Sequence, residues 1–72
     1  MSYILVFKTN IATQEDRSKV APVLDQQPFI QKWTVDIEDV DRVLRVVANE
    51  PAIDNIIELV RASDYECAEL LD

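Results

Sequence analysis

The amino-acid sequence predicts a small α+β domain with the element order βαββαβ, and three features indicate it. Residues 3–9 alternate in polarity and are rich in β-branched and aromatic side chains, as a strand would be. Two further strand-like segments lie between two amphipathic helical segments, and a short apolar segment at residues 66–71 reads as a last strand. With 72 residues, the chain is near the lower size limit for a self-sufficient core, so we expect one domain over residues 1–72.

The first helix is expected to begin at Thr13-x-x-Asp16, which has the pattern of a capping box. In this motif the hydroxyl accepts the N–H three residues on, and the acid reaches back. The apolar stripe that follows recurs at helical spacing and consists of Val20, Val23 and Leu24. Because Pro22 interrupts this stripe, and a proline inside a helix costs about 3 kcal/mol, we expect a kink or break near Ala21.

The second half of the chain supplies the remaining elements. Pro28 separates the first helix from a second strand, whose shared face consists of Trp33, Val35 and Ile37. Residues 38–41 have the polarity of a hairpin turn, and a third strand is expected over residues 42–48. Asn49-Glu50-Pro51 opens a second helix, since proline is well tolerated at the first helical position.

The buried stripe of the second helix consists of Ile53, Ile56, Ile57 and Val60. This helix should end near Ser63-Asp64, where aspartate can adopt the left-handed conformation that glycine usually supplies. The complete order is typical of a ferredoxin-like sandwich, a four-stranded antiparallel sheet with both helices on one face.

Charge and composition exclude several classes of function. The net charge is -7, and the seven basic residues are scattered, so no Lys/Arg stripe is present to bind a nucleic acid backbone. No apolar run approaches the roughly 20 residues of a membrane span. The N-terminus lacks the pattern of a signal peptide, and we expect a cytoplasmic protein.

Histidine is absent and Cys67 is the single cysteine, so one chain cannot form an internal disulfide. A zinc or Cu(I) site within one chain is nearly excluded as well, because these ions require several thiolate or imidazole ligands. The chain also lacks a glycine-rich phosphate loop and an activated nucleophile, so we expect neither an enzyme nor a bound cofactor.

Several segments together resemble the heavy-metal-associated domain family, and in particular its small copper-chaperone-like members. The resembling segments are Phe7-Lys8-Thr9-Asn10-Ile11, Lys19-Val20-x-Pro22-x-Leu24, Trp33-x-Val35-Asp36, Val43-Leu44-x-Val46 and Asp64-Tyr65, the last standing where the family usually has Gly followed by an aromatic. The resemblance implies the ferredoxin-like fold and a Cys-x-x-Cys motif that binds Cu(I) and passes it to a partner domain. Those two cysteines would fall on Thr13 and Asp16, and neither residue is a soft ligand.

Three candidate sites each have a plainer interpretation. Thr13 and Asp16 could select a hard cation, but two neighbours do not supply about six oxygens, and a helix cap is the simpler role. The acidic residues of the hairpin could bind Ca²⁺ or Mg²⁺ weakly, or form a solvated turn: Asp36, Glu38, Asp39 and Asp41. Cys67 could be a redox or metal residue, but a lone cysteine in a short strand is more often a small buried hydrophobe.

The strands of the predicted sheet are apolar on both sides. If one face packs on the helices through Tyr3, Leu5, Phe7, Trp33, Val35, Leu44 and Val46, the opposite face carries Ile4, Val6, Val43 and Val47. An exposed antiparallel face should be polar, and an apolar patch there often marks an interface. We therefore predict that these four residues bind another copy, giving a homodimer, or another protein. The alternative is that the valines only satisfy strand propensity on a face that also carries polar residues: Lys8, Lys32, Thr34 and Arg45.

Three functions follow as hypotheses. The leading one is a copper-chaperone-like domain that has lost its ligands and works as a protein-interaction or oligomerising module, with a metal-transporter domain among its possible partners. The second is metal binding or transport through unconventional ligands, such as Asp16, Cys67 or the acidic hairpin, either within one chain or shared between subunits. The third is a small-molecule regulatory module with the same element order, which is weakened because the chain has no glycine for a ligand-binding turn.

Overall fold

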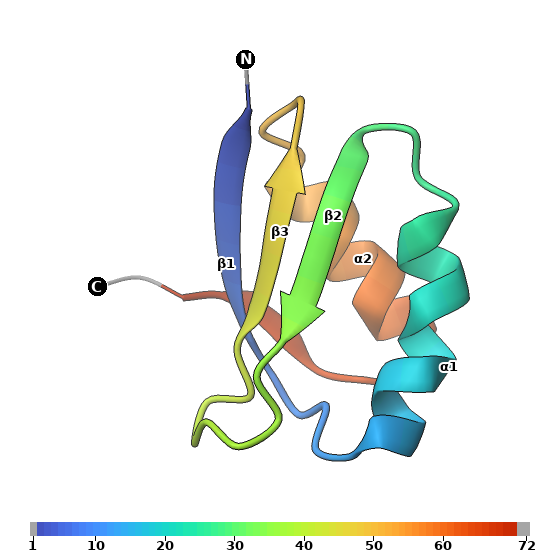
Figure 1. The fold of residues 1–72 in the computed structure, drawn as a ribbon, viewed down its shortest axis with the longest axis vertical. Coiled ribbons are helices and arrows are strands. Elements are labelled where there is room, and N and C mark those ends of the chain that lie inside the picture. The colour runs from blue at the N-terminus through green and yellow to red at the C-terminus, as the bar shows by residue number, and fades with distance from the viewer. Residues whose placement is uncertain (1, 71–72) are drawn as a thin grey trace.

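The computed structural model describes residues 2–70, whose elements follow the predicted order βαββαβ (Figure 1). The strands and helices are β1 (Tyr3–Thr9), α1 (Gln14–Asp25), β2 (Ile30–Val35), β3 (Leu44–Ala48), α2 (Ile53–Ala62) and β4 (Cys67–Glu69). The ferredoxin-like α+β fold is therefore confirmed. Neither helix in this described part of the chain is long and apolar enough to cross a membrane.

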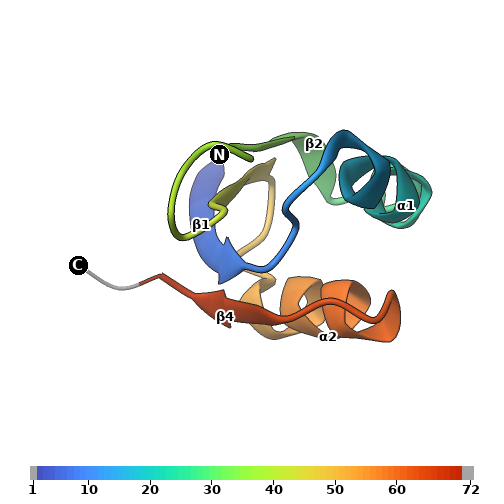
Figure 2. The same cartoon turned by 90° about the horizontal axis from the view of Figure 1, so that it is seen from below.

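The four strands form one antiparallel sheet in the order β2-β3-β1-β4. Both helices lie on the same side of this sheet, so its other side is uncovered within the described residues (Figure 2). The central strand β1 pairs with β3 along residues 3–7 and with β4 along residues 7–9. The end of β1 is thus held from both sides immediately before the chain turns into α1.

The core lies between the sheet and the helices and follows the predicted alternation, except at Tyr3, which lies at the start of β1 and is exposed. Phe7, which is fully buried, lies opposite the equally buried Leu44 on β3. Its buried neighbours come from every element except β2: Leu5, Ile11, Val20, Leu24, Val46, Ala48, Ile56, Val60 and Cys67. Trp33 packs against this cluster from β2 and is half-buried, and its indole N–H donates to Asp25 Oδ1 at 2.8 Å.

Helix α1 runs without interruption through Pro22 to Asp25, so the predicted break near Ala21 is wrong. The proline removes the one hydrogen bond that position 22 would donate to an earlier carbonyl. Fully buried side chains on both sides of it, Val20 and Leu24, keep the helix seated on the core. The packing of Val20 and Leu24 on the core therefore offsets the tendency of Pro22 to break the helix.

The connection between β2 and β3 is longer than the predicted turn at residues 38–41. Asp36 Oδ1 accepts the N–H of Glu38 at 3.2 Å, and Asp39 Oδ1 accepts the N–H of Asp41 at 2.8 Å. Arg42 then adopts a positive φ of 47°, and its guanidinium donates to a carbonyl within the same turn. These local bonds take Ile37 out of the second strand and delay the third until Leu44, two residues later than predicted.

Helix α2 begins at Ile53, two residues after Pro51, so the predicted start at the proline is wrong. The N–H of Ala52 instead donates to the carbonyl of Glu50 at 2.9 Å, which forms a turn before the helix. The end was predicted correctly, because Asp64 adopts a φ of 69° directly after Ser63.

The end of α2 has the pattern of a Schellman motif. Asp64 N–H donates to Arg61 O at 3.0 Å, and Tyr65 N–H donates to Val60 O at 3.3 Å. This turn fixes the direction in which Tyr65 leaves the helix. The following strand β4 is shorter than the predicted 66–71, and Leu71 lies outside the described residues.

Candidate functional site

The junction between β1 and α1 is closed by a helix cap. Thr13 has extended backbone angles, and its Oγ1 accepts the N–H of Asp16 at 3.0 Å. The carboxylate of Asp16 reaches back as predicted, but to the N–H of Ala12, one residue before the cap, at 3.2 Å. Asp16 and Glu15 also place negative charge in the first turn, where the helix dipole favours it.

The second oxygen of the Asp16 carboxylate is bound from the far end of the chain. The hydroxyl of Tyr65 donates to Asp16 Oδ1 at 2.8 Å. This hydrogen bond is the largest cause that lowers the pKa of Asp16 below its ordinary 3.8; partial burial opposes it, and bonds from Ala12 and Thr13 add to it. The same bond is the largest cause that raises the pKa of Tyr65 above 10.0.

A second contact joins the same two segments. The N–H of Glu66 donates to Asn10 Oδ1 at 2.8 Å. Within the junction itself, Thr9 Oγ1 accepts the N–H of Ile11 at 3.2 Å and donates to the carbonyl of Arg42 at 2.6 Å. The polar groups of residues 9–16 are therefore largely engaged in holding the loop, which connects β1, the β2–β3 turn and the segment after α2.

The bond between Asp16 and Tyr65 gives a testable pH dependence. A carboxyl whose folded pKa is lowered contributes stability above its unfolded pKa, here 3.8, and loses it as the pH falls through the folded value. A tyrosine whose folded pKa is raised contributes stability below 10.0 and loses it as the pH rises through the folded value. A Tyr65→Phe variant should therefore unfold at a lower urea concentration than the natural chain between these limits, and the difference should narrow below pH 3.8 and above pH 10.0.

Tyr3→Phe is the matched control for this measurement, because Tyr3 lies at the start of β1 and is 38% exposed. We expect it to leave the urea midpoint nearly unchanged at every pH. A Tyr65→Phe midpoint equal to that of the natural chain would show that the bond contributes nothing to stability.

The acidic residues of the β2–β3 hairpin were also candidate metal ligands. Among residues 2–70, no three Asp, Glu, Cys or His side chains form a group that could hold a metal ion. In the acidic hairpin, Asp36 and Asp39 use side-chain oxygens to bind backbone N–H groups of the turn itself. These two carboxylates thus stabilise the longer connection between β2 and β3.

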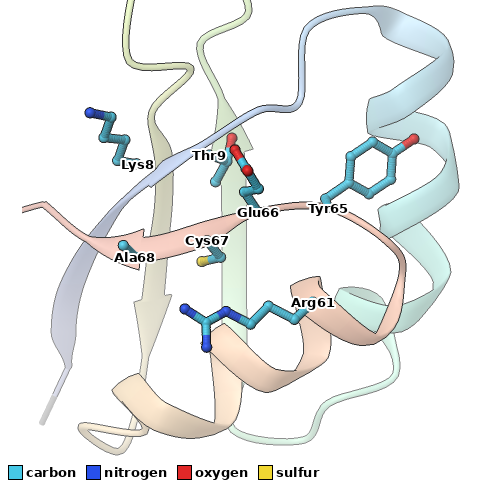
Figure 3. A pocket seen from close by; sticks show the side chains of 7 residues that line it. All are labelled: Lys8, Thr9, Arg61, Tyr65, Glu66, Cys67 and Ala68. Carbon is cyan, nitrogen blue, oxygen red and sulfur yellow. The ribbon is translucent and has the colours of Figure 1, made fainter.

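Cys67 lies at the start of β4 and is 3% exposed. Burial raises the pKa of its thiol to about 11, although the nearby Arg61 guanidinium acts in the opposite direction. The thiol is therefore protonated at neutral pH, and a protonated thiol is a poor nucleophile and a poor ligand. It borders an open hollow of about 430 Å³ at the β1–β4 edge, lined by Lys8, Thr9, Arg61, Tyr65, Glu66 and Ala68 (Figure 3).

Four residues were predicted to bind a partner, and three of them lie close together on the uncovered face of the sheet. Ile4 is 68% exposed and lies opposite Val47 on β3, and Val6 is the next residue of β1 on this face. Leu70 joins them, because its N–H donates to Val6 O at 2.9 Å and continues the β1–β4 ladder. We call Ile4, Val6, Val47 and Leu70 the open-face patch.

Val43 does not belong to this patch. It lies before β3 at the hairpin end of the sheet, beside polar and charged residues: Thr34, Asp36, Asp39 and Arg45. On the uncovered face, Arg45 of β3 lies between Val43 and Val47 and so separates Val43 from the open-face patch.

Comparisons with known proteins agree on the fold. No protein-family model and no curated protein matches the sequence. Oxidized MerP from Ralstonia metallidurans CH34 is similar with a TM-score of 0.83 at 9% identity, over 99% of this chain and 100% of that one. The apo HMA domain of a copper chaperone for superoxide dismutase gives 0.81 at 17% identity, over 99% of this chain and 69% of that one. The copper(I)-loaded first domain of the human copper chaperone for SOD1 gives 0.80 at 17% identity, over 96% and 93%.

This chain has the fold of a heavy-metal-associated domain. The resemblance recognised in its sequence is thereby confirmed for the fold. On this heavy-metal-associated fold, the two positions at which the resemblance places cysteines are the cap residue Thr13 and the Tyr65-bound Asp16.

Sequence reasoning identified the cap but missed its long-range partners. The sequence pattern marks Tyr65 only as the aromatic that follows Asp64, and Asn10 only as part of the segment from Phe7 to Ile11. The pairs Asp16–Tyr65 and Asn10–Glu66 are separated by 49 and 56 positions, so no local spacing could indicate them. Leu70 was missed as a member of the open face, although the alternation from Cys67 through Ala68 would have placed it there.

Proposed function

We propose that this protein is a divergent heavy-metal-associated domain with a degenerate metal site, and that it works as a protein-interaction or oligomerising module without catalysis. The supporting observation is the state of the Asp16 carboxylate. Both of its oxygens accept hydrogen bonds, one from Ala12 and one from Tyr65. Soft ions bind thiolate or imidazole groups, and Thr13 and Asp16 offer a hydroxyl and an engaged carboxylate.

The partner in this proposal is a second copy or another protein that binds the uncovered sheet face. The proposed interface is the open-face patch, extended at the hairpin end of the sheet by Val43, which completes the four residues predicted from the sequence: Ile4, Val6, Val43 and Val47. The proposed partners include a metal-transporter domain, since the resemblance implies that copper chaperones pass Cu(I) to a partner domain. We further propose a cytoplasmic location, where reducing conditions keep a single thiol free.

The function without metal is tested by adding Cu(I) or Zn²⁺ to the purified chain under reducing conditions. We expect the melting temperature to stay unchanged and the metal to separate from the protein on a desalting column. A ligand that binds only the folded state raises stability by mass action, so real binding would be visible. A rise of several degrees, or metal retained in a one-to-one ratio, would refute the proposal and favour binding through unconventional ligands.

A further inference from the structure

The open sheet face has a charge opposite to that of the chain as a whole. Within the strands, the charged side chains on this face are Lys8 on β1, Arg45 on β3 and Lys32 on β2, and all three are cations. The chain has 14 acidic residues and only seven basic ones. Three of those seven are therefore collected on one face of a strongly acidic protein.

These cations lie beside the open-face patch, and two of them form no ion pair with any acidic residue that the structure describes. Arg45 lies opposite Val6 in the β1–β3 register, and Lys32 lies opposite Val47 in the β2–β3 register. No ion pair within residues 2–70 involves Arg45 or Lys32, and Lys8 only approaches Asp41 at 4.0 Å. The hairpin acids Asp36 and Asp39 line a hollow together with Arg45 but form no ion pair with it. The strands of this face thus present apolar side chains flanked by three cations, with the carboxylates confined to the hairpin end.

This arrangement disfavours a second copy as the occupant. A symmetric dimer uses the same patch on both subunits, so the interface would receive the three cations twice and no carboxylate from these strands. Unpaired like charges in a desolvated interface are costly. The net charge of -7 on each chain adds long-range repulsion.

From the juxtaposition of the open-face patch with Lys8, Lys32 and Arg45, we infer that this face binds a different protein, one that presents an apolar centre flanked by carboxylates. The inference rests on the proposed role as an interaction module and names the chemistry of its partner. The partner's carboxylates would pair with Arg45 and Lys32, which form no ion pair among residues 2–70, and would compete with Asp41 for Lys8. The partner's apolar centre would cover Ile4, Val6, Val47 and Leu70.

The test uses two synthetic peptides, each with the same central leucine segment, flanked in one by glutamates and in the other by lysines. Binding is followed by peptide fluorescence anisotropy and by backbone amide shifts of the isotope-labelled chain. We expect the glutamate peptide to bind about tenfold more tightly or better, and to shift the amides of β1 and β3. Equal binding of both peptides, or shifts confined to the helices, would overturn the inference.

Arg45→Glu should remove this preference, and the matched control is Lys19→Glu, which makes the same charge change on the exposed side of α1. We expect the Lys19→Glu variant to keep most of the preference for the glutamate peptide over the lysine peptide. An equal loss in both variants would mean that net charge, and not the open face, selects the peptide.

Two further measurements address other occupants. Dimerisation of the natural chain at tens of micromolar in sedimentation, lost in Arg45→Glu, would overturn the inference in favour of a second copy. Binding to phosphatidylserine vesicles without binding to the glutamate peptide would overturn it in favour of a lipid surface. The metal titration tests the proposed function separately. If the chain bound Cu(I) and still preferred the glutamate peptide, the proposed lack of metal binding would be refuted, and the inference about the open face would stand.

Discussion

A Thr13→Cys, Asp16→Cys double variant should bind one Cu(I) ion per chain under reducing conditions, where we expect no binding by the natural chain. Thr13 is the N-cap and Asp16 is the third residue of α1, so both side chains belong to one helical turn. The N–H of Asp16 lies 3.0 Å from Thr13 Oγ1, which shows how closely the two positions approach. Thiols at a helix N-terminus have lowered pKa values and are present as thiolates more readily.

The double variant should be less stable than the natural chain when no metal is present. Loss of the Thr13 cap alone costs about 1 kcal/mol, and the hydrogen bond from Tyr65 is lost as well. Cu(I) should then raise its melting temperature, as measured by circular dichroism. The control is a Thr13→Ser, Asp16→Ser variant, which keeps hydroxyl groups and offers no thiolate.

Two results would contradict this prediction. A cysteine variant that melts cooperatively but binds no Cu(I) would mean that the alignment of residues 13 and 16 with the family motif is wrong. Equal Cu(I) binding by the serine control would mean that the ion binds elsewhere on the chain.

Phe7→Ala should remove most of the stability of the fold. Phe7 is fully buried and lies opposite Leu44 on one side and Glu69 on the other. Truncating a buried phenylalanine typically costs about 3–5 kcal/mol, and the total stability typical for a chain of this size is about 4–11 kcal/mol. Urea unfolding followed by circular dichroism should show a large drop in midpoint or no folded baseline at all.

Val6→Ala is the matched control, since Val6 is the adjacent residue and points to the uncovered face. We expect it to cost about 1 kcal/mol or less. A similar loss in both variants would contradict the assignment of faces to β1.

The fold could be predicted because its elements are encoded by local periodicity. The alternation through Phe7 and the helical stripe through Ile56 and Val60 each place apolar groups on one side, and the structure buries those groups. Asp64 was also predictable, since a left-handed residue after a helix depends on local chemistry. The errors arose where tertiary packing or side-chain bonds decide, as for the uninterrupted helix at Pro22 and the long turn held by Asp36.

The candidate site was predictable only in its local part. The Thr13 cap depends on residues three positions apart, so its pattern is visible in the sequence. The hydroxyl of Tyr65 reaches Asp16 because α2 ends in a defined turn that directs the following segment to the β1–α1 junction. That proximity is a property of the completed fold, which no spacing rule describes.

The separation of Asp16 and Tyr65 has a consequence for how the molecule assembles. Their hydrogen bond closes a loop of 49 positions, and the bond from Glu66 to Asn10 closes one of 56. Closing such loops costs chain conformational entropy, and this cost precedes any stabilising contact. These bonds should therefore form late in folding, after the helices have packed on the sheet. During synthesis the β1–α1 junction leaves the ribosome early. Its hydrogen bonds with Tyr65 and Glu66 cannot form until those residues have also been synthesised. Loss of the Tyr65 hydroxyl should accordingly speed unfolding more than it slows folding, which stopped-flow measurements on Tyr65→Phe would show.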